Sequence, residues 1–179
     1  MKYLTIGLFL LFTYSCTQGI SETSGGTDAE QRIRDLGIEL RTPEKPTANF
    51  VGAVRVDNMI YLSGRGPVQK DGSFITGKLG RDLTVEKGYE AARLTGIDLL
   101  SALKEEIDDL NKVKRLVKVL GVVNADPDFE RQPEVINGFS DLMVEVFGER
   151  GKHARSALGM GSLPYGIPVE IEMIVELHD

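Results

Sequence analysis

The chain has 179 residues, of which 41% are apolar and 27% charged, with one cysteine and a formal net charge of −6 at pH 7. This length suits one domain with a hydrophobic core, and the regular recurrence of apolar residues excludes wholesale disorder. One cysteine excludes a disulfide scaffold, a single apolar run excludes a multispanning membrane protein, and an acidic chain without tryptophan or a dense basic block is a poor general binder of nucleic acids.

The first segment has the pattern of an export signal. Lys2 precedes a run of about a dozen mostly apolar residues, which is short for a membrane span and suits a signal peptide. The only cysteine, Cys16, follows directly, and this arrangement resembles a bacterial lipoprotein signal. We expect residues 1–15 to be the signal peptide, Cys16 to carry a lipid, and residues 16–27 to be a flexible tether, which implies an exported, periplasmic or membrane-anchored protein. A simple secretory signal or an uncleaved anchor, with Cys16 incidental, is the alternative.

The remainder, residues 28–179, is expected to form a single domain. Asp28 and Thr84 are good N-caps for the helices that follow them, and Asp57-Asn58 suits a hairpin turn. In chain order the predicted elements are a helix over Ala29–Leu36, strands over Gly52–Val56 and Met59–Ser63, a short strand piece at Phe74–Thr76, a helix from Val85 to Ile107, a strand over Val113–Val123, a helix over Gln132–Phe147, and strands over Lys152–Leu158 and Pro168–Leu177.

These elements predict an α+β fold with a mixed sheet. Each of the two long helices has one dominant apolar stripe, so both are expected on one face of the sheet. No third long helix is predicted to cover the other face. We therefore expect the chain to oligomerise through that face.

Common metal and nucleotide motifs are missing from the sequence. It holds no CxxC, HExxH, P-loop or GxSxG pattern, and its two histidines are too few for a metal cluster. The sequence therefore predicts neither a metal nor a cofactor.

The C-terminal segment carries the most specific pattern. Arg155-Ser156 is followed eight residues after the arginine by Leu163-Pro164, and then by Glu170 in a Glu-rich strand. This combination resembles the signature of the RidA/YjgF family, also called L-PSP endoribonuclease-like. Residues 58–64, which end in Ser-Gly, and Asn137 in the second long helix also fit the family, and the resemblance covers roughly residues 35–179.

The resemblance implies a chorismate-mutase-like fold, a homotrimer with ligand clefts between subunits, and hydrolysis of 2-imino acids to 2-keto acids and ammonia. Arg155 would grip the substrate carboxylate and Glu170 would orient or deprotonate a water. Asn137 and the backbone at Ala157 would contribute to the site. Phe50 stands where family members often have a tyrosine, and it has no hydroxyl. The Gly-rich stretch 159–162 and a longer loop at 124–134 indicate a divergent subgroup.

Several alternatives stay open from the residues alone. Arg155 could form a surface ion pair with Glu170 or Glu172, and His153, on the same strand face as Arg155, could be an acid/base group or structural. A trimeric module that binds a small carboxylate without turnover is the alternative function. The endoribonuclease activity in the older family name is disfavoured by the acidic charge and the lack of a basic or aromatic patch.

Overall fold

A five-stranded sheet organises the computed structural model, which describes residues 27–43 and 46–179. Its strand order is β1-β2-β5-β3-β4. The strands are β1 (Ala53–Val56), β2 (Met59–Arg65), β3 (Val113–Asn124), β4 (Ala154–Met160) and β5 (Val169–Leu177). The β3–β4 pair is parallel and the other pairs are antiparallel, so the sheet is mixed, as the sequence predicts.

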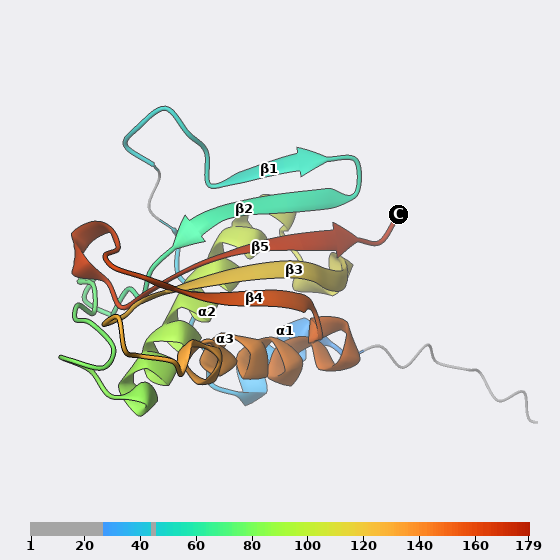
Figure 1. Cartoon of the computed structure of the whole chain (residues 1–179). Helices are drawn as coiled ribbons and strands as arrows, with labels where there is room; N and C mark the ends of the chain where they lie inside the picture. Colours follow the sequence, from blue (N-terminus) through green and yellow to red (C-terminus); the bar gives the residue numbers. More distant parts are fainter. Residues whose placement is uncertain (1–26, 44–45) are drawn as a thin grey trace, which may run out of the picture.

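The helices of the described chain lie on one side of this sheet (Figure 1). They are α1 (Ala29–Asp35), α2 (Val85–Ile107) and α3 (Gln132–Phe147), with short 3-10 turns η1 (Leu110–Lys112), η2 (Gly148–Gly151) and η3 (Pro164–Gly166). Helix α2 packs on β2 and β5, and α3 packs on β3 and β4. The predicted arrangement of two long helices on one face is confirmed.

Local signals in the sequence fix where α1 and α2 begin. The Asp28 side chain accepts a hydrogen bond from the Gln31 N–H, and the Thr84 side chain accepts one from the Lys87 N–H. Both are the expected N-caps, each stabilising its helix by about 1 kcal/mol. The predicted hairpin turn also forms, with Asp57 at φ 53°.

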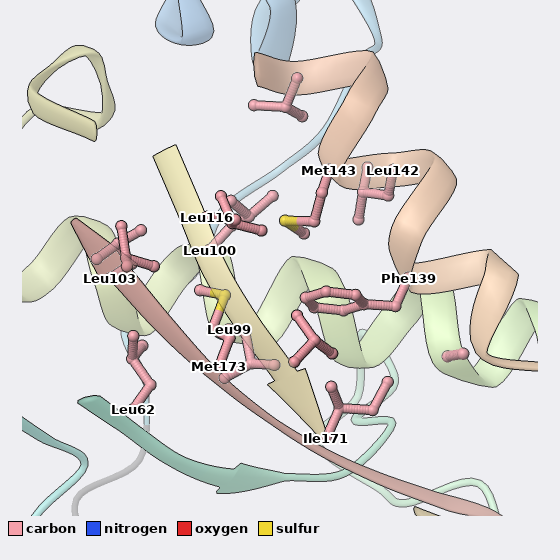
Figure 2. Packing of buried hydrophobic residues seen from close by; sticks show 14 of the residues in the cluster. Leu62, Leu99, Leu100, Leu103, Leu116, Phe139, Leu142, Met143, Ile171 and Met173 are labelled. Carbon is pink, nitrogen blue, oxygen red and sulfur yellow. The ribbon is translucent and has the colours of Figure 1, made fainter. Parts of the chain in front are cut away.

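The core lies between the helices and the sheet (Figure 2). Gly96 lets α2 approach α3 closely, since a Cβ there would lie 2.8 Å from Leu142 Cδ2. Along β5 the residues alternate between the buried helix side and the opposite face of the sheet, as predicted. The labelled core side chains are Leu62, Leu99, Leu100, Leu103, Leu116, Phe139, Leu142, Met143, Ile171 and Met173.

The sheet face opposite the helices, called the open face below, is covered by no element of residues 27–43 and 46–179. It carries apolar side chains that are about half exposed. They are Val54, Val56, Tyr61, Leu158 and Met160. An apolar surface of this kind is typical of a protein interface, so the predicted uncovered face is present in the single chain.

Two predicted elements differ from the structure. The piece at Phe74–Thr76 is not a strand; Phe74 forms one isolated bridge with Val68, and its ring stacks on Tyr165. The strand predicted at Lys152–Leu158 is β4, which begins and ends two residues later because η2 and the Lys152 hydrogen bond to Glu149 O extend the turn.

The predicted signal peptide, residues 1–15, and Cys16 lie outside the described residues, as does the tether 16–27 except for Thr27. The Thr27 carbonyl accepts a hydrogen bond from the Arg150 guanidinium, which holds the start of the domain against η2. None of the helices in the described ranges is both long enough and apolar enough to cross a membrane.

Candidate functional site

Arg155 lies on the edge strand β4 and turns its guanidinium toward α3. Its Nη1 donates to Asn137 Oδ1 and to Ser140 Oγ, both at 2.9 Å. Its Nη2 donates a longer bond, 3.4 Å, to the carbonyl of Pro133. The packing of α3 on β4 therefore brings together Arg155 and Asn137, two residues that the sequence assigns to the site.

These contacts engage one edge of the guanidinium. Both Nη1 hydrogens are used, whereas Nε–H donates to no group of the described chain and Nη2 has one further hydrogen. The Nε and Nη2 hydrogens point in the same direction and form a two-pronged donor. That geometry matches a carboxylate, which accepts two parallel hydrogen bonds.

Ala157 lies two residues beyond Arg155 on β4 and therefore on the same face of the strand. Its methyl group packs against the core, and its register partner on β3 is Gly121. The structure thus places Asn137, Arg155 and Ala157 together at the β4 edge, and we call these three residues the arginine half-site.

Glu170 lies on β5, on the open face of the sheet. Its carboxylate sits over Gly64 of β2, where an added Cβ would be 2.4 Å from Glu170 Oε1. Partial burial and, secondarily, the charge of Glu172 raise the pKa of the Glu170 carboxyl. No hydrogen bond from the described residues contributes to the pKa of this carboxyl, so its oxygens are available to a water or a substrate. Such a group suits a general base.

Phe50 lies just before β1 and is 58% exposed. The segment that carries it is tied to β2 by Ser63, whose hydroxyl donates to Val51 O at 2.7 Å and whose N–H donates to Gly52 O at 3.0 Å. Ser63 precedes Gly64, so the segment that carries Phe50 runs beside the end of β2 where the Glu170 carboxylate lies. We call Phe50, Gly64 and Glu170 the glutamate half-site.

A buried ion pair fixes β2 where the glutamate half-site stands. Asp98 of α2 is 4% exposed and accepts from Arg65 Nη1 at 2.9 Å and from Arg41 Nε at 3.0 Å. Arg65 directly follows Gly64, so Asp98 holds the strand end from the helix side. Arg41 is drawn to the same carboxylate, which pins the segment before β1.

The two half-sites lie on opposite faces of the sheet. Arg155 pairs in register with Val119, which is buried on the helix side, whereas Glu170 pairs with Val122, three residues further along β3. Side chains alternate along a strand, so these positions point to opposite faces. One chain therefore does not bring Arg155 and Glu170 together, and the alternative of an Arg155 ion pair with Glu170 or Glu172 is wrong.

Sequence reasoning missed two contributions. Ser140 lies three residues after Asn137 on α3, a spacing that places both on one helix face, yet only the packing on β4 shows that both reach Arg155. Gly64 appeared only as a strand end, although its missing side chain makes room for Glu170. His153 contacts Ser140, which confirms that it shares a side with Arg155.

Among the described residues, no group of three or more His, Cys, Asp or Glu side chains is arranged to hold a metal ion.

Known proteins resemble this chain over nearly its whole domain. The family model described as "YjgF/chorismate mutase-like, putative endoribonuclease" matches residues 30–177. Protein TCP17 of Trypanosoma cruzi is 40% identical over 148 residues, which cover 82% of this chain and 92% of the relative. The chain belongs to the YjgF/chorismate mutase-like family.

Solved structures agree with this assignment. Atu1372 of Agrobacterium tumefaciens, a protein of unknown function, is 39% identical with a TM-score of 0.78, covering 84% of this chain and 92% of its own. RidA of the Antarctic bacterium Psychrobacter sp. PAMC 21119 is 20% identical with a TM-score of 0.55, covering 78% and 98%, a likeness that shows the fold alone. The chain thus resembles Atu1372 more than it resembles this RidA.

Proposed function

We propose that this protein is a homotrimeric deaminase that hydrolyses 2-imino acids to 2-keto acids and ammonia at sites between subunits. The single observation that carries the proposal is the pair of half-sites. A two-pronged arginine donor and an unpaired carboxylate with a raised pKa occur in one chain but on opposite sides of its sheet. A second subunit that sets its β4 edge against the open face would complete the site.

The two half-sites suit the two ends of the substrate. The Nε and Nη2 donors of Arg155 would bind the carboxylate of a 2-imino acid and hold its imine carbon in place, which removes much of the entropic barrier. Glu170 would take a proton from a water as its oxygen bonds to that carbon. The C–N bond then breaks, the nitrogen leaves as ammonia with the transferred protons, and the carbon keeps the water oxygen as a keto group.

Phe50 and the open face define the rest of the assembly. The exposed Phe50 ring would form an apolar wall beside the substrate side chain, without supplying a proton. The half-exposed apolar residues of the open face would be buried by the neighbouring subunits. We also propose export through the segment before the domain, with Cys16 lipidated; labelling with a radioactive fatty acid tests the lipid, and absence of label on the protein would refute it.

The direct test is keto-acid release from freshly generated 2-iminopropanoate, with residues 28–179 and the variants Arg155→Ala and Arg81→Ala side by side. Arg81 is an exposed arginine that pairs with Asp82 far from either half-site along the chain, and it is the matched control. We expect activity in the wild type and Arg81→Ala, and a loss of about 100-fold or more in Arg155→Ala. A folded trimer without activity above background would overturn the deaminase.

A carboxylate-binding module without turnover is the second candidate. It is favoured by Phe50, which places no hydroxyl at the site. Saturable binding of a 2-keto acid that Arg155→Ala abolishes, without turnover of any imino acid, would establish it. Cleavage of RNA that follows the purified trimer and disappears in Arg155→Ala would instead support the endoribonuclease activity in the family description.

A further inference from the structure

A chain of hydrogen bonds runs from the turn before β4 to the guanidinium of Arg155. His153 Nδ1 lies 2.7 Å from the carbonyl oxygen of Gly151, and His153 Nε2 lies 3.2 Å from Ser140 Oγ. Ser140 Oγ in turn accepts from Arg155 Nη1 at 2.9 Å. The three side chains come from α3 and β4 and are all partly buried.

With His153 neutral, the direction of every bond in this chain follows from its two ends. A carbonyl oxygen only accepts, so His153 carries its proton on Nδ1 and donates to Gly151. Neutral His153 then has an acceptor at Nε2, to which the Ser140 hydroxyl donates. Arginine only donates, so Ser140 uses a lone pair for Arg155, and one serine hydroxyl satisfies both neighbours.

We infer that His153 and Ser140 are positioning residues that orient Arg155, with His153 neutral and protonated on Nδ1. By taking the Ser140 proton, His153 turns the serine oxygen lone pair toward Arg155. That contact and the Asn137 contact engage both Nη1 hydrogens, and one Nη2 hydrogen reaches the Pro133 carbonyl of α3, so Nε–H and the other Nη2 hydrogen are left for a ligand. The role in holding a substrate carboxylate rests on the proposed function; the orientation of Arg155 does not.

The surroundings of the imidazole favour the neutral ring. Burial lowers the pKa of His153, against a smaller raising effect of the Gly151 hydrogen bond, and the positive charge of Arg155 adds a still smaller lowering effect. Lys152 and Arg115, opposed by the carboxylate of Glu176, line the surface hollow beside the ring. The edge-on contact with Phe139, at 5.8 Å between ring centroids, fixes the plane of the imidazole.

The first arm of the test needs no substrate. The sequence has two histidines, so nitrogen-15 NMR of the full domain resolves both imidazoles, and the variant His178→Gln assigns them. We expect His153 at pH 7.5 in the Nδ1–H form. Its Nε2 signal should shift in Ser140→Ala but not in Ser140→Thr, which keeps the hydroxyl. Rotation about the Cζ–Nη bonds of Arg155 should be faster in Ser140→Ala than in Ser140→Thr.

The second arm measures binding of pyruvate, a simple 2-keto acid. Ser140→Ala should raise its Kd about tenfold, since a hydrogen bond to a charged group is lost, whereas Ser140→Thr should stay within about twofold. His153→Ala should act through the same serine, so the double variant Ser140→Ala/His153→Ala should bind no more weakly than the weaker single variant.

The outcomes separate the two proposals. An Nε2–H tautomer, unchanged Arg155 rotation in Ser140→Ala, or additive losses in the double variant would overturn the positioning role. A wild type that does not bind pyruvate, with the expected tautomer and Arg155 rotation, would overturn the proposed function and leave the orientation of Arg155 established.

Discussion

Mixing two inactive variants tests whether the site is shared between subunits. Arg155→Ala destroys the arginine half-site and leaves the glutamate half-site intact, and Glu170→Gln does the reverse. The two half-sites lie on opposite faces of one sheet, so in the proposed trimer a neighbouring pair would combine the intact half of each variant. Each variant alone has no complete site, so the mixture should be more active than either of its parts.

The recovered activity follows from counting sites in a ring of three. In the proposed ring of three, each subunit would donate one half-site to its neighbour, so a trimer with both variants would have one intact site of three. Random assembly at equal amounts makes about three quarters of the trimers mixed. The mixture should therefore reach about one quarter of wild-type activity.

The assay is keto-acid release from freshly generated 2-iminopropanoate after the two variants are unfolded together and refolded. Each variant refolded alone is the background, and light scattering confirms that the mixture is trimeric. Separately refolded variants that are combined just before the measurement control for simple addition. A refolded trimeric mixture no more active than its separate components would refute a site built from two subunits.

Three further outcomes follow from the environment of the glutamate half-site. Gly64→Ala would place a Cβ 2.4 Å from Glu170 Oε1, where ordinary contact begins near 3.4 Å, so the carboxylate must move by about 1 Å. A displacement of that size should lower kcat/KM about 100-fold. Gly161→Ala, whose added Cβ would have nothing within 4 Å, is the control and should stay near wild type. Burial raises the pKa of Glu170 above its ordinary value of 4.5, so the ionised carboxylate destabilises the fold. Glu170→Gln should therefore have a higher melting temperature than wild type at pH 7.5, and the difference should shrink toward pH 4. Melting temperatures equal to wild type at both pH values would contradict burial as the cause of the raised pKa. Asp98→Asn breaks the ion pairs of the buried Asp98 with Arg65 and Arg41 and should lower the free energy of unfolding in urea by about 3 kcal/mol. Glu39→Gln removes an exposed ion pair and should change that free energy by less than about 0.5 kcal/mol. Equal effects would mean that Asp98 does not hold the end of β2 in place.

The spacing of apolar residues predicted the main helices and strands, because one face of each element must be apolar to enter the core. The alternation along Pro168–Leu177 specified which side chains of β5 enter the core, and the stripe from Val85 to Ile107 specified the buried face of α2. The short piece at Phe74 was misread because its apolar ring is used differently. It stacks on Tyr165, with ring centroids 5.9 Å apart, rather than joining the sheet.

The arginine half-site could be predicted only in part. Arg155 and Asn137 followed from their resemblance to a family pattern, but the participation of Ser140 depends on how far α3 is rotated over β4. That rotation is set by side-chain packing across the layer, and no local pattern in α3 or β4 specifies it. The same holds for Gly64, whose importance depends on Glu170 from a strand far away in the sequence.

The separation of Arg155 from Glu170 has a similar cause. Alternation fixes which residues of one strand share a face, but it does not compare residues on different strands. The register of β3 with both β4 and β5 makes that comparison, and it puts the two side chains on opposite faces. The spacing of the two residues in the sequence therefore could not specify whether one chain holds a complete site.

The location of Glu170 links the proposed chemistry to the proposed assembly. Glu170 and the exposed Leu158 flank the same residue, Val122, on the open face. An interface that buries the apolar side chains of this face would therefore also cover Glu170. The exclusion of water from the interface would strengthen any charge interaction of that carboxylate. Arg155 of a neighbouring subunit would hold the substrate carboxylate beside Glu170, an arrangement that one chain alone does not provide. Association and catalysis would then depend on the same surface, and a charge placed at Leu158 should impair both together.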